Sequence, residues 1–269
     1  MSTPKMDGAQ ALIKTLADLG IEYVFGYSGG AAIPIFDALQ TVKTDMKFIL
    51  VRHEQGAVHM ADGYARATGK PAVVLVTSGP GAGNTVTGIM TAQMDSVPMI
   101  ILCGQQVTWM LGKDAFQEAD IFNITSPVVK HNFLVKSSNA LPRIAREAYH
   151  IATTGRPGPV LIDIPKDISQ GPFTGTFDEP MDLPGYNPSE NFKIDPAGIK
   201  EAARLIAGAK RPVILAGQGA MIARADKELM ALAETCGIPV TTTLLGKGVF
   251  PETHPLSLGM LGMHGTAYA

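Results

Sequence analysis

The sequence has few cysteines and no concentrated block of positive charge. Only two cysteines, Cys103 and Cys236, occur among 269 residues, and they form no C-x-x-C pair. This usage is typical of a reduced cytosolic protein. The formal net charge is −2, from 22 Lys and Arg against 24 Asp and Glu. Without a basic cluster, a nucleic-acid partner has no electrostatic support.

Long hydrophobic segments are absent as well. The amino terminus carries no apolar signal region, and no apolar run approaches the ~18 residues that a membrane span needs. We therefore expect a cytoplasmic protein without membrane contact. Because 46% of the residues are apolar, the chain can bury a sizeable core in one or two domains.

What the sequence does have is an alternation of strand-like and helix-like segments. Helical apolar spacing is found at residues 10–19, 57–68, 85–93 and 141–153. Buried strands are expected at residues 23–25, 48–51, 72–77, 99–103 and 160–164. This α/β alternation predicts a parallel sheet covered by helices on both faces.

A region rich in proline and glycine, residues 171–192, interrupts this pattern. Residues before proline avoid the helical conformation, so the region is predicted to be an extended linker. A second α/β unit should follow, with helices at 196–209 and 223–236 and strands at 213–216 and 240–243. Because so few elements bury little core, this unit looks incomplete.

A carboxylate and a glycine turn follow neighbouring predicted strands. Glu54 comes after the second strand, and the turn at 78–84 comes after the third. Ligands of open α/β sheets collect outside the carboxyl ends of the strands, so the two form a candidate cofactor site. The simpler interpretation of Glu54 is a first-turn carboxylate that complements the helix dipole. A zinc site is disfavoured because His53 and His59 face different sides of a helix.

The other candidate segments have simple structural readings. The 78–84 turn lacks the third glycine of a dinucleotide fingerprint and the acid about 20 residues further on, so it is a tight turn or a backbone nest. Gly217 and Gly219 follow a predicted strand, so they form either a plain turn or a contact to a nucleotide. Residues 116–120 are a surface loop or a cavity lining. Lys166 is by default solvated.

Together these segments resemble the thiamine diphosphate enzymes, most closely the catalytic large subunits of the acetohydroxyacid synthase (acetolactate synthase) family. The resemblance runs over nearly the whole chain. Residues 114–120 (Asp-Ala-Phe-Gln-Glu-Ala-Asp) and 262–265 (Gly-Met-His-Gly) are fairly specific to this branch. The remaining likeness lies in residues 25–30, 53–57, 63–67, 77–81 and 155–159.

The resemblance implies a pyrimidine-binding domain at residues 1–170, a linker at 171–192 and a truncated FAD-binding-like middle domain at 193–269. Glu54 would bond N1′ of the cofactor's aminopyrimidine and assist proton removal from the thiazolium C2. Because burial disfavours a free carboxylate, it should share a proton with the ring. Gln117 would be the second catalytic residue, Phe116 would line the cavity with it, and Lys166 would lie along the substrate channel.

The cofactor contacts carried over from the family fall into two sets. The thiamine set adds four residues to Glu54: Gly26, Tyr27, Ser28 and Gly29. The FAD set comprises Arg156, Gly217, Gly219, Thr243, Leu244, Met263 and His264. Two positions depart from the family: Ser28 stands where proline is usual, and Gly83 stands where threonine is usual.

The implied reaction joins pyruvate to a second 2-keto acid, pyruvate or 2-ketobutyrate, with release of CO2, in the synthesis of branched-chain amino acids. The family anchors the diphosphate through Mg²⁺ on a Gly-Asp-Gly motif, which these residues lack. We therefore expect an amino-terminal portion of the enzyme, inactive alone, with no metal ligand of its own. The implied partners are further copies sharing the active site and a regulatory small subunit.

Three alternatives stay open at this point. One is another thiamine diphosphate carboligase or decarboxylase, such as a sulfoacetaldehyde acetyltransferase-like enzyme. The second is a nucleotide-binding oxidoreductase, and the third is a non-catalytic interaction fragment.

Overall fold

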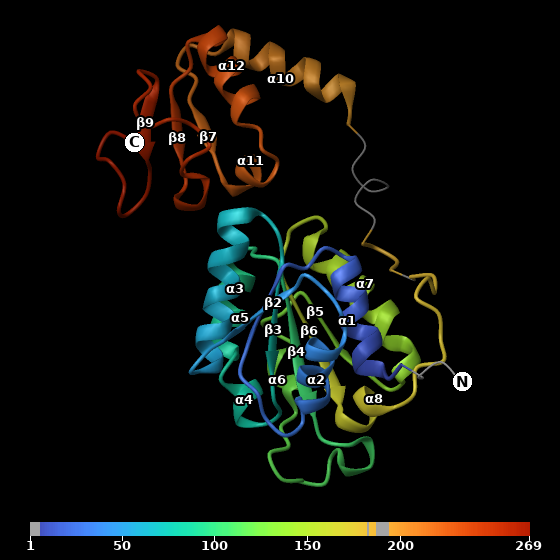
Figure 1. Cartoon of the computed structure of the whole chain (residues 1–269). Coiled ribbons are helices and arrows are strands. Elements are labelled where there is room, and N and C mark those ends of the chain that lie inside the picture. Colours follow the sequence, from blue (N-terminus) through green and yellow to red (C-terminus); the bar gives the residue numbers. More distant parts are fainter. Residues whose placement is uncertain (1–5, 182, 187–193) are drawn as a thin grey trace. The chain divides into compact units, whose positions relative to one another are not determined.

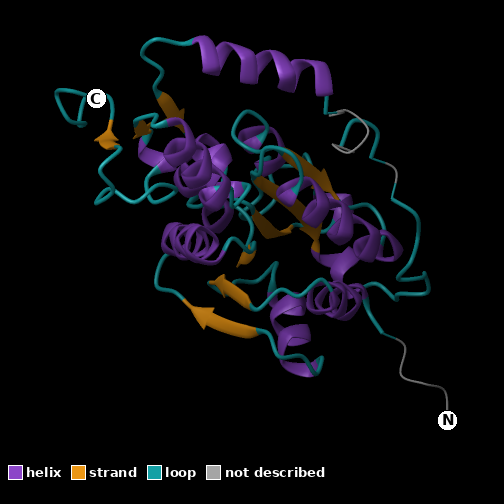
Figure 2. Ribbon diagram, turned by 90° about the horizontal axis from the view of Figure 1, so that it is seen from above, coloured by secondary structure: helices purple, strands orange, loops and turns teal. Residues whose placement is uncertain are grey.

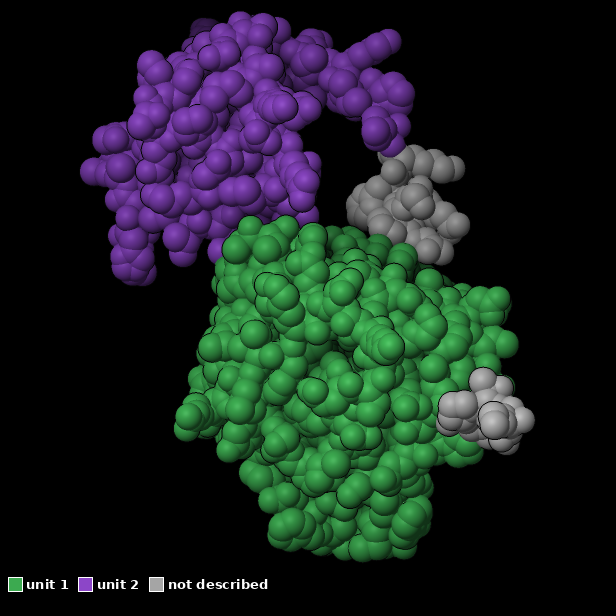
Figure 3. Space-filling view, viewed as in Figure 1, with its two compact units in different colours: residues 1–191 green, residues 192–269 purple. Residues whose placement is uncertain are grey.

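The computed structural model describes residues 6–181, 183–186 and 194–269. The chain divides into two compact units, residues 1–191 and 192–269 (Figure 3). We describe each unit by itself. Residues 182 and 187–192 of the predicted linker lie outside the described residues.

Unit 1 is built on a six-stranded sheet in which every neighbouring pair of strands is parallel (Figure 1). The strand order is β2-β1-β3-β4-β6-β5. The strands are β1 (Tyr23–Gly26), β2 (Lys47–Leu50), β3 (Ala72–Val76), β4 (Met99–Gln105), β5 (His131–Leu134) and β6 (Pro159–Pro165). The predicted parallel sheet is confirmed. Strand β5 was not predicted, because it is short, half-buried and begins with the polar residues His131 and Asn132.

Helices cover both faces of this sheet (Figures 1 and 2). One face packs against α1 (Gly8–Asp18), α2 (Ile33–Thr41), α7 (Leu141–Thr153) and α8 (Lys166–Gln170). The other packs against α3 (Glu54–Thr68), α4 (Pro80–Gly83), α5 (Val86–Met94) and α6 (Ile121–Thr125). The 3₁₀ turns are η1 (Thr108–Met110) and η2 (Ser138–Ala140).

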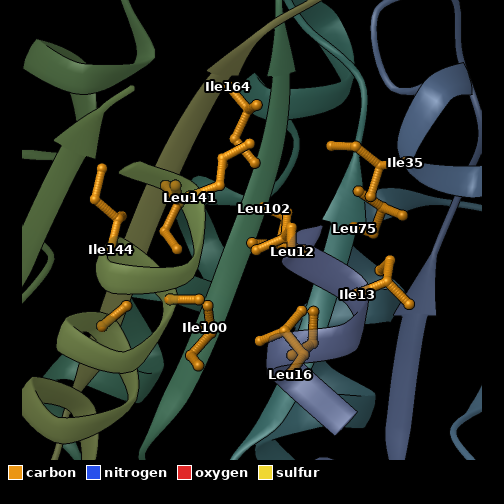
Figure 4. Close-up of a cluster of buried hydrophobic side chains, with 14 of the residues drawn as sticks. Leu12, Ile13, Leu16, Ile35, Leu75, Ile100, Leu102, Leu141, Ile144 and Ile164 are labelled. Atoms are coloured by element: carbon orange, nitrogen blue, oxygen red, sulfur yellow. The ribbon is translucent and has the colours of Figure 1, made fainter. Parts of the chain in front are cut away.

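The period of two along the strands divides the core between the two faces. Val73 and Leu75 of β3 belong to the first cluster, while Val74 and Val76 belong to the second. Figure 4 shows the first cluster, where Leu75, Ile100 and Leu102 of the sheet meet side chains of α1, α2 and α7. Because each central strand is buried on both faces, its sequence is a continuous apolar run rather than an alternating one.

Helix α3 begins three residues earlier than the predicted 57–68. His53 is its N-cap, and the His53 Nδ1 accepts from the backbone N–H of Gln55 at 3.2 Å. Gly69 ends the helix with φ of 72°, a left-handed conformation that glycine adopts without strain. This cap makes Glu54 the first residue of the helix.

The described part of the predicted linker starts as a strap on unit 1. The backbone N–H of Gly8 donates to Gly171 O, and that of Phe173 donates to Met6 O, both at 2.9 Å. The Asn139 carboxamide oxygen then accepts from the backbone N–H groups of Thr174 and Gly175. The first residues of the predicted linker are therefore fixed to α1 and η2, while the extended linker itself stays a prediction.

Unit 2 holds a three-stranded parallel sheet in the order β7-β8-β9. Its elements are α10 (Pro196–Gly208), β7 (Ile214–Ala216), α11 (Gln218–Ile222), α12 (Asp226–Cys236), β8 (Val240–Thr242), η3 (Leu244–Gly246) and β9 (Ser257–Met260). The predicted helix 223–236 is wrong at its start, because α11 ends at Ile222 and α12 begins at Asp226. Strand β9 was missed because Gly259, with φ of 73°, breaks its pattern. In the described part of the chain, no helix is long and apolar enough to cross a membrane.

Candidate cofactor site

The candidate site lies at the carboxyl edge of the unit 1 sheet. Because its strands are parallel, the segments that follow β1, β2, β3, β4 and β6 all emerge at this edge. In Figure 1 the loop after β4 projects beyond the sheet at the end where α4 lies. The predicted thiamine set, Phe116, Gln117 and Lys166 all belong to these segments, so the fold brings them to one edge.

Glu54 is a buried carboxylate with a fixed partner. It is only 8% exposed, and its Oε2 accepts from the Asn84 Nδ2 at 3.0 Å. Its position at the start of α3 places the negative charge at the positive end of the helix dipole. The dipole interpretation is therefore compatible with the geometry, but it does not explain why the carboxylate is turned inward to meet the segment after β3.

Three glycines beside the segment from Leu75 to Thr77 leave no room for a side chain. A Cβ at Gly26 would lie 2.2 Å from Leu75 O, and one at Gly29 would lie 2.5 Å from the Thr77 Cβ. At Gly81 it would lie 2.8 Å from the Thr77 Cγ2 and 3.3 Å from the Glu54 Oε1. The backbone after β1 therefore approaches the turn after β3 as closely as it can. We call Gly26, Gly29, Thr77 and Gly81 the glycine cradle.

Thr77 is a site residue that the sequence predictions missed. Its Oγ1 accepts from the backbone N–H of Ala31 at 3.3 Å and so ties the segment after β1 to the segment after β3. Next to it, the buried Ser78 Oγ has no hydrogen-bond partner among the described residues. A buried hydroxyl of this kind is available to a ligand or a water molecule. A threonine and a serine directly before Gly79 were the available signal.

The loop of residues 106–120, hereafter the site loop, touches the turn after β3 at Gln117. A Cβ at Gly79 would lie 2.5 Å from Gln117 O. Both residues have positive φ, 58° at Gly79 and 55° at Gln117. Positive φ at a residue other than glycine is strained and occurs mainly where the surroundings impose it. Phe116, which precedes Gln117, is 81% exposed and its side chain is free to meet a ligand.

Hydrogen bonds within the site loop fix its shape. The Gln106 Nε2 donates to Phe116 O at 2.6 Å. The Glu118 carboxylate accepts from the backbone N–H groups of Ala115 (2.8 Å) and Gly112, and these bonds lower the pKa of Glu118. Residues 116–120 were predicted as either surface structure or a lining segment, and they belong to a folded loop at the sheet edge.

Beside the site loop is a pocket of about 560 Å³ with a buried carboxyl group in its wall. Asp163 of β6 is 2% exposed, and burial raises its pKa to about 7. Its Oδ2 accepts from the Gln105 Nε2 at 3.1 Å, while its Oδ1 has no partner among the described residues. Sequence reasoning missed both residues, although an aspartate inside the apolar run of β6 was a signal.

Lys166 and Arg156 lie at opposite edges of the sheet. Lys166 begins α8, directly after β6, and shares the edge of Glu54. Arg156 precedes β6, and its guanidinium donates to Ser96 Oγ (2.6 Å) and Met94 O (3.1 Å). Arg156 thus joins two turns of unit 1, and its assignment to a flavin contact stays a prediction.

The other residues of the predicted FAD set meet at the carboxyl edge of the unit 2 sheet. Gly217 follows β7, Thr243 and Leu244 follow β8, and Met263 and His264 follow β9. Thr243 donates its backbone N–H to Ala216 O, and its Oγ1 accepts from the backbone N–H of Gly246. Leu244 is 68% and Met263 95% exposed. This edge can meet a large apolar ring system, but the flavin assignment is still a prediction.

Potential metal ligands do not cluster among the residues that the structure describes. Within the described ranges, no group of three or more His, Cys, Asp and Glu side chains could hold a metal ion. His53 caps α3 through its Nδ1, and the His59 Nε2 lies 3.5 Å from the Gln55 Nε2. The two imidazoles thus contact different groups of Gln55, its backbone N–H and its carboxamide.

Comparison with known proteins gives consistent matches over both units. The amino-terminal TPP-binding domain of thiamine pyrophosphate enzymes matches residues 6–124, and the central domain of these enzymes matches residues 199–269. The chain is 51% identical over 265 residues to the acetolactate synthase large subunit of Mycobacterium tuberculosis, covering 98% of this chain and 42% of that protein.

Two further relatives are similar to the same extent. The acetolactate synthase large subunit of Haemophilus influenzae is 49% identical over 267 residues, 98% of this chain and 46% of the relative. That of Corynebacterium glutamicum is 50% identical over 265 residues, 98% of this chain and 42% of the relative. The chain spans less than half the length of each of these relatives.

Proposed function

The chain belongs to the thiamine pyrophosphate enzyme family, and from this we propose that unit 1 holds the aminopyrimidine half of thiamine diphosphate at Glu54. The observation that carries the proposal is the inward-facing Glu54 carboxylate beside the glycine cradle. A flat ring needs close backbone approach and a few well-placed polar groups, and the cradle, Glu54 and the unpartnered Ser78 hydroxyl fit these needs.

Glu54 holds or releases a proton at the cofactor ring. Thiamine diphosphate, when bound, supplies the carbanion chemistry that breaks and forms carbon–carbon bonds next to a carbonyl. Asn84 fixes the orientation of the Glu54 carboxylate through its 3.0 Å bond, leaving Oε1 toward Gly81. The nearly dry surroundings keep water from competing for that proton.

For the complete protein we propose acetolactate synthase activity, the condensation of pyruvate with pyruvate or 2-ketobutyrate and release of CO2. The supporting observation is that relatives about 50% identical to this chain are acetolactate synthase large subunits. In this proposal Phe116 and Gln117 face the substrate, and Lys166 lies along its channel. We also propose that unit 2 contributes to an FAD site and that the diphosphate and Mg²⁺ are held by residues outside these 269. Further copies of the protein would share the site, and a small subunit would regulate it.

The test is hydrogen–deuterium exchange at the thiazolium C2 in the complete enzyme, followed by NMR. Glu54→Gln keeps the shape and the contact with Asn84 but cannot carry the proton in the same way. We expect exchange to slow markedly in Glu54→Gln, whereas Glu147→Gln, which alters a buried carboxylate of α7 paired with Arg143, serves as the matched control and should leave exchange unchanged. Unchanged exchange in Glu54→Gln would refute the role given to Glu54.

A further inference from the structure

The site loop is connected to the interior of the sheet by a chain of hydrogen bonds that starts at Asp163. The Gln105 Nε2 donates both to Asp163 Oδ2 (3.1 Å) and to Ala119 O (2.9 Å). The Gln105 Oε1 in turn accepts from the backbone N–H of Gln106 at 2.8 Å. One buried carboxamide therefore holds both ends of the loop, residues 106 and 119.

Gln106 extends this chain to the residues of the proposed cavity. Its Nε2 donates to Phe116 O, directly before Gln117. Because Gln117 has a strained backbone with φ of 55°, its conformation needs support from the residues around it. The closeness of Gln117 O to Gly79 supplies support on one side, and the Gln106 bond supplies it on the other.

A second attachment of the loop is separate. The Asp167 carboxylate accepts from the backbone N–H (2.9 Å) and the hydroxyl (2.6 Å) of Thr108. This bond pair holds the first turn of the loop, η1, and involves neither Gln105 nor Ala119. It therefore offers a comparison for the Asp163 chain.

We propose that Asp163 and Gln105 are positioning residues: through the hydrogen bonds to Ala119 and Gln106 they hold Phe116 and Gln117 in the orientation that the reaction requires. These hydrogen bonds, hereafter the tether, hold the site loop whatever reaction the protein catalyses. Their role in catalysis rests on the proposed function. Gln105 is 3% and Asp163 2% exposed, so we assign neither of them a contact with the substrate. Their effect reaches it through the backbone of the site loop.

The pocket beside Asp163 gives the site loop room to move if these hydrogen bonds are lost. Both Asp163 and Gln105 line it, so the tether runs beside a cavity rather than through packed core. In such a place the loop has room to move once the bonds are lost. Leucine at either position would fill part of the volume without replacing the bonds.

Limited trypsin digestion measures the tether without cofactor or turnover. Lys113 is the only Lys or Arg among residues 106–120 and is exposed. We expect Asp163→Leu and Gln105→Leu each to speed cleavage after Lys113 roughly three- to tenfold, the range for loss of one buried hydrogen bond. The double variant should not exceed the larger single effect, because both changes break one chain.

Two matched variants complete the digestion test. Asp163→Asn keeps an acceptor for Gln105 and should cleave at close to the wild-type rate. Asp167→Ala frees the other attachment and should add its effect to that of Gln105→Leu. The proposal is overturned if the leucine variants leave Lys113 cleavage unchanged. It is also overturned if cleavage there rises only in step with cleavage after Arg143 of α7, which reports unfolding of the whole unit.

A pH profile distinguishes a tether from simple packing. Trp109, the only tryptophan, lies in the site loop and is 62% exposed, so acrylamide quenching of its fluorescence reports loop mobility. Burial raises the pKa of Asp163 to about 7, so its ionisation favours an opened loop that hydrates the carboxylate, and quenching should rise as the pH rises from 6 to 8. Asp163→Asn should give a flat profile, and a wild-type profile equally flat would contradict the proposal.

The groups around Asp163 are few. Cys103 of β4 and Leu134 of β5 are its register partners, and burial raises the pKa of the Cys103 thiol, which stays neutral over this range. Asp120, Glu118 and Lys136 line the same pocket. The variant Asp163→Asn separates their titration from that of Asp163.

The effect of the tether on catalysis is tested in the complete enzyme. Gln105→Leu is expected to lower kcat while thiamine diphosphate affinity is retained, because the Glu54–Asn84 pair is untouched. If cleavage after Lys113 is faster but kcat is unchanged, the hydrogen bonds hold the loop but do not position residues for catalysis. That result would overturn the proposed positioning role. Absence of acetolactate synthesis in the wild-type complete enzyme would instead count against the proposed function.

Discussion

The two units carry their candidate sites in different ways. In unit 1 the site residues are fixed by bonds between distant segments, such as Glu54 with Asn84 and Ala31 with Thr77. In unit 2 the predicted FAD residues stand on a three-stranded sheet over a small core, and Leu244 and Met263 face solvent. From this difference we infer that the carboxyl edge of the unit 1 sheet is nearly preformed, whereas the unit 2 edge needs a covering group to bury its apolar surface.

The largest difference between the units should appear in turnover. In the complete enzyme, Glu54→Gln is expected to lower kcat by roughly 10²- to 10⁴-fold, the usual contribution of a positioned proton-transfer group. Met263→Ala in unit 2 should mainly weaken FAD binding. Steady-state acetolactate formation with added FAD measures both. Comparable losses of kcat in the two variants would contradict the comparison.

The free energy of unfolding of unit 1 should depend on pH through Asp163, by about 3 kcal/mol. The pKa of Asp163 in the folded protein is about 7, above the ordinary value of 3.8, so the folded state binds this proton more tightly than the unfolded state. The stabilising contribution is therefore present below pH 4 and is lost as the pH rises to about 7. Between pH 5 and pH 8 the loss amounts to about 3 kcal/mol.

Urea unfolding of wild type and Asp163→Asn at pH 5 and pH 8 measures this loss. The variant carries no titrating group at this position, so its free energy of unfolding should gain on the wild type as the pH rises. A constant difference between the two proteins at both pH values would show that Asp163 does not titrate as inferred.

Glycine-to-alanine substitutions compare how much space surrounds the backbone in the two units. Gly26→Ala places a Cβ 2.2 Å from Leu75 O and should lower the free energy of unfolding by about 2 kcal/mol, because backbone has to move. At Gly219 in α11 nothing lies within 4 Å of the added Cβ, so Gly219→Ala should be neutral or slightly stabilising. Chemical denaturation monitored by circular dichroism measures both. Equal effects would remove the contrast.

The smallest expected effect is local to unit 2. Thr243→Val removes the Oγ1 that accepts from the Gly246 N–H, and loss of such a cap costs about 1 kcal/mol. Hydrogen exchange of the Gly246 amide should rise, while the amides of β3 in unit 1 stay protected. Faster exchange in both units would mean that they unfold together.

The sequence predicted those parts of the fold that depend on continuous apolar runs. Strands β3 and β4 are buried along their whole length, so the residues at 72–76 and 99–103 carry an unambiguous signal. Strands β5 and β9 carry none, because His131 and Asn132 make the start of β5 polar and Gly259 interrupts β9. Helix α2 was also missed, since it begins directly after a glycine turn without a side-chain cap.

The candidate site was predictable where a family pattern exists and not where side chains meet only in three dimensions. Glu54 was identified from its neighbours in the sequence. Gln105 and Asp163 are 58 residues apart and form a pair only because β4 and β6 are adjacent in the sheet. Thr77 likewise acquires its role from Gly29, which the order of strands β1 and β3 brings to it.

The strand order has a consequence for how this protein is made. The bonds at the sheet edge join residues 30, 46 and 58 positions apart, so the edge closes only after the central strands have paired. Contacts so distant along the chain form slowly, and an incompletely paired sheet exposes apolar strands that can aggregate. A ligand that binds only the closed edge stabilises the folded chain by mass action. Cofactor supply during synthesis would then govern how much active protein a cell recovers.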